Sequence, residues 1–248
     1  MSAFRKMETF VYKHLVVPLQ GRHTFDFVGD IYIKGNKILD FGSGIGTNSK
    51  LFDHEDYIGV DVDHSRVEES RRTFPEYEFK EIPYISSDDD HLPFPDHSFD
   101  FIFISLCLHH VDSNNCKVLF KEFRRLLKRD GVIIGIEPVV TKNIFSNIFM
   151  NLIDGGDYIL RKGNYKEMYA SESFQVDSVN IVTAFGYHLW QYKAKSLDSD
   201  SSHPFLSKIT DYRRFIKPFN QAILYGKWVM VFYLGYLLSH SIWLKFNI

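Results

Sequence analysis

The stretch Lys37-Ile38-Leu39-Asp40-Phe41-Gly42-Ser43-Gly44-Ile45-Gly46 decides the fold of this chain. It opens with a short apolar run, typical of a β-strand, and passes at once into a glycine-rich turn that leads into a predicted helix. Glycine lets the backbone turn sharply and lets a ligand approach the main chain without a Cβ in the way. The spacing is G-x-G-x-G, whereas the dinucleotide-binding fingerprint is G-x-G-x-x-G. The stretch therefore predicts a ligand-binding turn and disfavours a nicotinamide oxidoreductase.

A second strand is predicted at Tyr57-Ile58-Gly59-Val60-Asp61 and ends in an acid about twenty residues after the glycine turn. A carboxylate at this place can accept hydrogen bonds from both hydroxyls of an adenosine ribose. The alternative is that Asp61 caps the following helix, and the pairing with the glycine turn favours the ribose. Asp63 is also able to cap that helix, which is expected to run to about Phe74.

Strands and helices continue to alternate along the chain. A weak strand within 77–86 contains Pro83, which cannot donate to a strand ladder, so this strand is expected at a sheet edge. Residues 99–105 form a continuous apolar run, typical of a strand buried on both faces. The further elements are a helix at 114–129 and strands at 132–136, 176–185 and 187–194, the last two joined by a turn at Gly186. This order predicts an α/β fold with a parallel sheet covered on both faces.

Composition excludes several classes of function. The 248 residues carry 29 basic and 31 acidic side chains, and this balance argues against nucleic acid as a partner. Cys107 and Cys116 form no CxxC pair, so neither a zinc site nor a disulfide framework is expected. The N-terminal sequence has no long apolar run of the signal-peptide type, which favours the cytoplasm.

Both ends of the chain are predicted to add helices to the central domain. Apolar residues at helical spacing predict an N-terminal helix at 4–19, within a cap of residues 1–30, before a domain of residues 31–195. A C-terminal extension, residues 196–248, contains the aromatic and apolar run 222–244. Packing onto the domain is favoured slightly for this run, peripheral membrane contact remains a serious alternative, and a true span is least expected because Lys227 and His240 interrupt it.

The motifs ILDFGSGIG, YIGVDVD, SDDDHLPFPDHSFDFIFISLCLHHV and EFRRLLKRDGVIIGIEP together resemble the class I S-adenosylmethionine-dependent methyltransferases. The resemblance covers residues 37–138 and points to the small-molecule branch that includes the ubiquinone and menaquinone C-methylases. It implies a Rossmann-like, seven-stranded, three-layer α/β/α fold with helical caps, and S-adenosylmethionine as cofactor. In that family the third strand lies at a sheet edge, which agrees with the position of Pro83.

The resemblance also implies a cofactor site, residue by residue. The aspartate and glycines of the first motif would hold the methionine end of the cofactor. Ser43 stands where the family often has Cys, but its backbone role is unaffected. Asp89 stands where many members have Ala, so the adenine contact stays open within 88–90, and three acids in a row also suit a solvated loop. The implied cofactor-binding residues are Asp40, Gly42, Ser43, Gly44 and Gly46, then Asp61 and Val62 at the ribose, Asp88 and Asp89 at the adenine, and Ser105 and Leu106 at the sulfonium side.

His109 and His110, after the predicted strand 99–105, are the catalytic candidates. A base is needed only where the methyl acceptor carries a proton at a hydroxyl or an activated carbon, and histidine suits that role. The alternative is that one histidine caps the next helix and the other packs. Metal binding is not expected, because adjacent side chains point apart and no third ligand is evident.

The sequence thus predicts methyl transfer to oxygen or carbon of a small-molecule or lipid-linked acceptor. The alternative is an inactive cofactor-binding scaffold that docks on a partner or a membrane through its C-terminal helix. Aromatic residues beyond the cofactor half would suit a roof over an apolar acceptor, although packing is favoured for most of them. These residues are Tyr158, Tyr165, Tyr169, Tyr187, His188 and Trp190.

Overall fold

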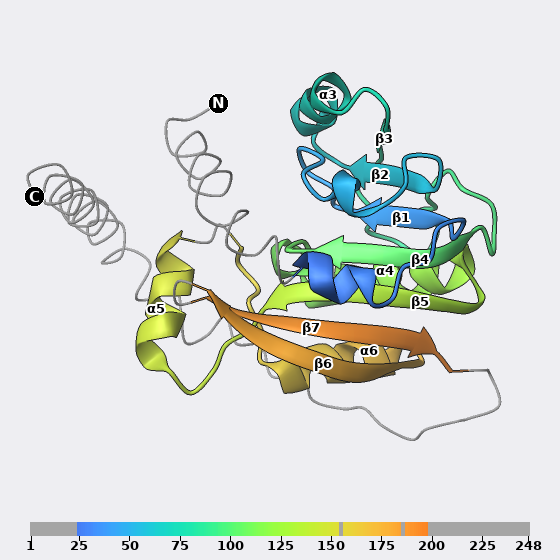
Figure 1. Cartoon of the computed structure of the whole chain (residues 1–248). Helices are drawn as coiled ribbons and strands as arrows, with labels where there is room; N and C mark the ends of the chain where they lie inside the picture. The colour runs from blue at the N-terminus through green and yellow to red at the C-terminus, as the bar shows by residue number, and fades with distance from the viewer. Residues whose placement is uncertain (1–23, 154–155, 185–186, 198–248) are drawn as a thin grey trace, which may run out of the picture. The chain divides into compact units, whose positions relative to one another are not determined.

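The computed structural model describes residues 24–153, 156–184 and 187–197. Within these ranges the strands form one seven-stranded sheet in the order β3-β2-β1-β4-β5-β7-β6 (Figure 1). The strands are β1 (Ile38–Phe41), β2 (Tyr57–Asp61), β3 (Glu78–Glu81), β4 (Phe99–Ser105), β5 (Leu127–Pro138), β6 (Phe174–Ala184) and β7 (Tyr187–Ser196). The predicted seven-stranded Rossmann-like fold is confirmed.

The sheet is mixed. β1 to β5 run parallel to one another, whereas β7 runs antiparallel to both β5 and β6. The expected parallel sheet therefore holds for five strands, and a short connection between β6 and β7 forces the last two to be antiparallel. β3 lies at one edge, as predicted, but it ends at Glu81, so Pro83 lies outside the strand that was predicted to contain it. The strand order reverses between β1 and β4, which marks the usual place for ligands in open α/β sheets.

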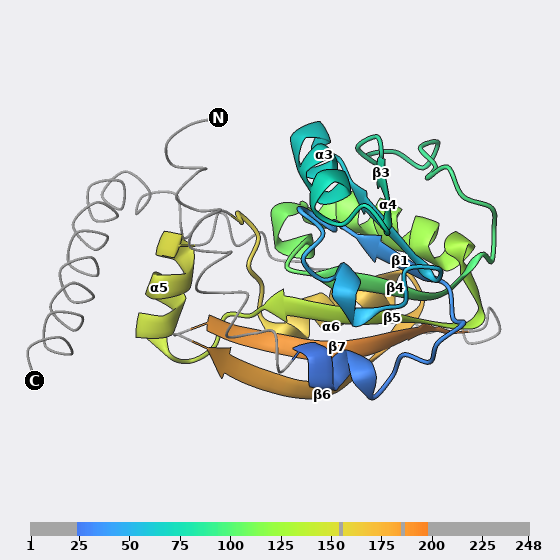
Figure 2. The same cartoon turned by 45° about the horizontal axis from the view of Figure 1, so that its top comes forward.

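Helices cover both faces of the sheet. In the described residues the longer α-helices are α3 (His64–Thr73), α4 (Ser113–Leu126), α5 (Ile144–Ile153) and α6 (Lys162–Ser171). The short 3-10 helices are η2 (Ser49–Leu51) and η3 (Leu108–His110), and residues 24–29 are also helical. One buried cluster joins the sheet to α4 and α6, and a second joins its other face to 24–29, α3 and α5. These clusters make the three layers α/β/α. In Figures 1 and 2, α5 lies beyond the carboxyl ends of β4 and β5.

Local sequence explains where α3 and α4 begin. Asp63 accepts hydrogen bonds from the amides of Ser65 and Arg66, and α3 then runs to Thr73, as predicted. Asp112 caps α4 in the same way through the amides of Asn114 and Asn115. Both acids compensate amide groups that have no partner within the first helical turn.

Two local predictions were wrong. The helix predicted at 114–129 ends at Leu126, because Leu127 takes an extended conformation and pairs with Phe99 at the start of β5. The glycine turn leads only into the 3-10 helix η2, not into an α-helix. Hydrogen bonds from the amide of Gly46 to Ser43 and of Ser49 to Gly46 keep this segment in tight turns.

Several predictions lie outside the described residues: the helix at 4–19, the turn at Gly186 and the run 222–244. Whether that run packs on the domain or meets a membrane stays a prediction. In the described part of the chain, no helix is long and apolar enough to cross a bilayer.

Candidate active site

The glycine turn follows β1 and brings three parts of the molecule together. Gly42, Gly44 and Gly46 all have positive φ angles of 74°, 57° and 77°, which glycine adopts readily. A Cβ on Gly42 would overlap Cys107, and one on Gly46 would lie 2.7 Å from the ring of Phe79. At Gly44, by contrast, the nearest atom would be 4.0 Å away, at the guanidinium of Arg66. Gly42 and Gly46 therefore allow close packing, and Gly44 leaves the main chain open to a ligand.

Asp61, at the end of β2, faces this turn. Its side chain is 7% exposed, and its two oxygens accept the amide of Gly44 at 2.8 Å and the amide of Asp63 at 2.9 Å. Helix α3 is capped by Asp63 and not by Asp61, which settles the alternative raised from the sequence. Val62 beside it is 50% exposed.

Asp40 is buried beneath the turn with an incomplete set of partners. Oδ2 accepts the hydroxyl of Tyr57 at 2.6 Å, but Oδ1 is buried and has no hydrogen-bond partner among the described residues. The hydroxyl of Ser43 is also buried and also has no hydrogen-bond partner among the described residues. Burial raises the pKa of Asp40 to about 7; the hydrogen bond from Tyr57 lowers it and the nearby charge of Asp61 raises it. A buried oxygen without a donor is costly, so Asp40 is suited to a ligand that donates.

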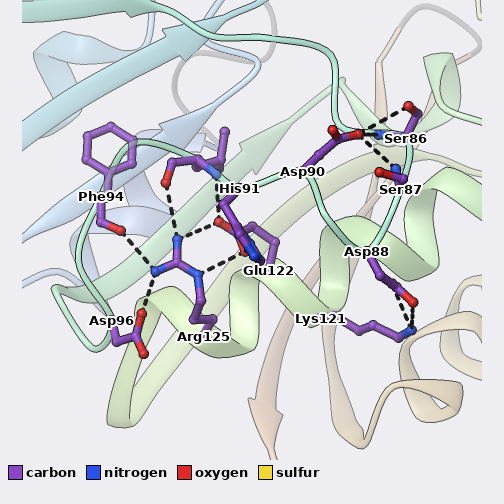
Figure 3. A network of polar contacts seen from close by, with 11 residues as sticks. Ser86, Ser87, Asp88, Asp90, His91, Phe94, Asp96, Lys121, Glu122 and Arg125 are labelled. Carbon is purple, nitrogen blue, oxygen red and sulfur yellow. Dashed lines mark hydrogen bonds and ion pairs between the residues drawn. The ribbon is translucent and has the colours of Figure 1, made fainter.

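Residues 86–98 are tied to α4 by a polar network (Figure 3). Arg125 donates to the carbonyls of Leu92 and Phe94 at 3.2 and 3.0 Å and to both oxygens of Glu122 at 3.0 and 2.6 Å. Glu122 also accepts the amide of Leu92 at 2.7 Å. Burial raises the pKa of Glu122, but the bonds from Arg125 and Leu92 outweigh that effect and leave it below its usual value. The network explains the conformation of the LPFPD segment.

Replacing Arg125 by methionine is expected to lower the free energy of unfolding by about 2–4 kcal/mol, because buried Glu122 would lose its charged partner. Urea unfolding measures this loss. Arg124→Met is the matched control, since Arg124 is exposed and, among the described residues, its hydrogen bond is a long one of 3.4 Å to the carbonyl of Glu172. Equal stability of the two variants would show that the network does not anchor the loop.

Two of the three acids at 88–90 already have hydrogen-bond partners within the protein. Asp88 is exposed and forms an ion pair with Lys121 of α4, both oxygens lying 2.9 Å from Nζ (Figure 3). Asp90 closes its own turn by accepting the amides of Ser86 and Ser87, each at 2.9 Å. Asp89 is exposed. The adenine assignment of Asp88 and Asp89 stays a prediction, and it requires Asp88 to exchange Lys121 for the ligand.

The end of β4 lies beside the glycine turn, because β4 pairs with β1 and Cys107 packs against Gly42. Ser105 is half-buried, and Leu106 has a positive φ of 54°, with its amide bonded to the carbonyl of Ile136 at 2.8 Å. His109 is 2% exposed and His110 is exposed, although their rings lie only 4.2 Å apart. The two histidines are therefore not equivalent, and His110 is the one that a ligand in solution can reach.

The buried acid Glu137, near the end of β5, was not predicted as a site residue. Oε1 accepts the amides of Cys107 and Leu108 at 3.0 and 2.8 Å, and Oε2 lies 2.8 Å from Nδ1 of His109. Burial, followed by the charges of Glu137 and Asp61, raises the pKa of Cys107, which keeps this thiol protonated. The sequence did contain a signal for Glu137, because an acid ends the apolar run VIIGIE. The same pattern led to the prediction of Asp61 as a site residue.

Three of the six residues suggested as a roof are core residues. Tyr165, Tyr169 and Trp190 are fully buried, and the hydroxyls of Tyr169 and Tyr192 lie 2.9 Å apart. Packing, the favoured reading, is confirmed for these three. His188 is half-buried and contacts Thr183. In the described residues no group of His, Cys, Asp or Glu is arranged to hold a metal ion, and both cysteines are free.

Comparisons with known proteins agree with this geometry. A family model described as a methyltransferase domain matches residues 39–135. Over these residues the chain is similar to methyltransferase domains, and its seven-stranded sheet fits the Rossmann-like methyltransferase fold. Methyltransferase YcgJ of Bacillus subtilis, which is uncharacterised, is 27% identical over 118 residues, 47% of this chain and 46% of that protein. The demethylmenaquinone methyltransferase of Renibacterium salmoninarum is 30% identical over 118 residues, with the same two shares.

The solved structure of YcgJ shares the fold of this methyltransferase domain, with a TM-score of 0.56 and 15% identity over 71% of this chain and 99% of that one. The chain spans about half the length of the curated relatives that it matches. The matched region contains Asp40, the glycine turn, Asp61 and both histidines, and it ends two residues before Glu137. The resemblance inferred from the sequence is thus confirmed for the domain.

Proposed function

We propose that this chain transfers a methyl group from S-adenosylmethionine to a small-molecule acceptor and releases S-adenosylhomocysteine. The observation that best supports the proposal is the unpartnered, buried Oδ1 of Asp40 beside the open glycine turn. It lies at the reversal of strand order, where α/β sheets bind ligands.

The residues present fit the cofactor. Its α-ammonium group is a hydrogen-bond donor of the kind that Oδ1 of Asp40 lacks. Each oxygen of Asp61 accepts one backbone amide and keeps acceptor capacity for a ribose hydroxyl. The carboxylates of Asp40, Asp61 and Glu137 all lie close enough to raise the pKa of Cys107, so the site suits a ligand with positive charge.

Bound S-adenosylmethionine would supply a methyl group that is already activated by its positively charged sulfur. The protein then has to align the donor with the acceptor and exclude water. Ser105 and Leu106 are proposed to line the sulfonium side. Because His109 is buried and His110 exposed, we assign His110 as the base that removes a proton from a hydroxyl or an activated carbon.

The acceptor is proposed to be a small molecule or a lipid-linked molecule, methylated at oxygen or carbon. The name of the Renibacterium relative, a demethylmenaquinone methyltransferase, supports this class. The near-neutral charge balance makes nucleic acid a poor acceptor.

The test is to incubate the purified protein with methyl-labelled S-adenosylmethionine and a protein-free small-molecule extract, and then to separate organic from aqueous products. Label is expected in an acceptor of one fraction, and His110→Ala is expected to slow its transfer by about 100-fold without changing the affinity for S-adenosylhomocysteine. Cofactor binding with no labelled product would favour the inactive scaffold. Transfer by His110→Ala at the normal rate would remove His110 as the base.

A further inference from the structure

Glu137 lies where three parts of the molecule meet at the carboxyl edge of the sheet. Its side chain is fully buried, and its residue pairs with Trp190 of β7, while the preceding Ile136 pairs with Ser105 of β4. Its Oε1 accepts the amides of Cys107 and Leu108, at the start of η3. Such amides have no partner within their own helix, so Glu137 supplies from a neighbouring strand the cap that η3 lacks.

Through Cys107, Glu137 is connected to the glycine turn. Cys107, held by Glu137, packs so closely on Gly42 that a Cβ there would overlap its side chain. The preceding Leu106 has a left-handed conformation, which is disfavoured for leucine and persists only where surrounding contacts hold it. Through Cys107, Glu137 therefore helps to hold the surface against which the glycine turn packs at Gly42.

Through His109, Glu137 is also connected to the segment around Tyr158, between α5 and α6. Oε2 of Glu137 holds Nδ1 of His109 at 2.8 Å, and the carbonyl of His109 accepts the amide of Tyr158 at 3.0 Å. This segment follows β5 at the same edge of the sheet, where acceptors enter in this kind of fold.

We propose that Glu137 is a positioning residue, which holds turn 106–109 between the glycine turn and the segment around Tyr158. The proposal rests on the proposed function, because it gives that turn a role in methyl transfer. A buried carboxylate is costly unless its oxygens are hydrogen-bonded, and an apolar side chain of similar volume would fill this space without that cost. The three hydrogen bonds to residues 107–109 supply the reason for an acid at this place.

Two substitutions separate positioning from packing. Glu137→Gln keeps an oxygen for the amides of Cys107 and Leu108, whereas Glu137→Met keeps the volume and removes both acceptors. In ligand-free protein, Glu137→Met is expected to speed hydrogen exchange at the amides of Cys107, Leu108 and Tyr158 by about 10-fold, and Glu137→Gln to leave it near the original rate. Calorimetry is expected to show about 10-fold weaker binding of S-adenosylhomocysteine to the methionine variant and a change below about 3-fold for the glutamine variant.

Tyr192→Phe is the matched control, because it removes one buried hydrogen bond on neighbouring β7 without touching the turn. It should bind S-adenosylhomocysteine as the unmodified protein does. The proposal would be overturned if Glu137→Gln and Glu137→Met showed equal hydrogen exchange and equal affinity. It would also be overturned if Glu137→Met and Tyr192→Phe lost the same affinity for S-adenosylhomocysteine. If the unmodified protein itself fails to bind S-adenosylhomocysteine, the proposed function fails, while the exchange rates still decide whether Glu137 holds the turn.

Discussion

Asp61→Ala is expected to weaken the binding of S-adenosylhomocysteine by about 100-fold or more, since two ribose hydroxyls would lose a charged acceptor. The side chain is almost fully buried and already orders the turn through the amide of Gly44. Alanine would therefore remove both the acceptor and part of the support for the turn. Calorimetric titration of the folded variant measures the loss.

Asp63→Ala is the matched control for this experiment. Asp63 is an acid two residues further on, and it caps α3 instead of facing the glycine turn. Its loss should cost about 1 kcal/mol of stability with little change in affinity. If Asp61→Ala binds S-adenosylhomocysteine as tightly as Asp63→Ala does, Asp61 does not hold the ribose.

Asp40→Asn is expected to change how stability depends on pH. Burial raises the pKa of Asp40 to about 7 from an ordinary value of 3.8. Between these two values the folded protein binds a proton that the unfolded chain has released, so this group makes the free energy of unfolding fall as pH rises to about 7. From pH 5 to pH 8 the loss amounts to about 2–3 kcal/mol, at about 1.4 kcal/mol per pH unit below the raised pKa.

Asparagine cannot titrate, so the free energy of unfolding of the variant should not include the fall with pH that Asp40 causes. Urea unfolding at pH 5 and pH 8 measures it as a difference between the variant and the unmodified protein, in which other titrating groups cancel. We expect the variant to gain about 2–3 kcal/mol on the unmodified protein between the two pH values. A difference that does not change with pH would mean that Asp40 is already ionised at pH 5.

Strand patterns in the sequence were sufficient to predict the seven strands, but not the antiparallel direction of β7. Apolar runs such as residues 99–105 and the edge position implied by Pro83 depend on local residue types, and the structure agrees with both. The end of α4 was missed because the basic residues and the Asp130-Gly131 pair resemble a helix terminus. Pairing of Leu127 with Phe99, a contact between distant parts of the chain, determines the actual boundary.

The candidate site was predictable where neighbouring motifs contain both the turn and the acids around it. Asp40, the glycines and Asp61 belong to two adjacent motifs, and the structure brings them together. The different exposure of His109 and His110 was not predictable, because it depends on Glu137, nearly thirty residues further along the chain. Likewise, the pairing of Asp88 with Lys121 depends on where α4 lies, which three consecutive acids do not encode.

The most direct test of the account is calorimetric titration of the unmodified 248-residue chain with S-adenosylhomocysteine, with NAD as the control ligand. We expect binding of S-adenosylhomocysteine in the micromolar range and no binding of NAD, because we propose Asp40, the glycine turn and Asp61 as the site for the former. A protein that binds neither ligand, or that binds NAD instead, would contradict the assignment of this site.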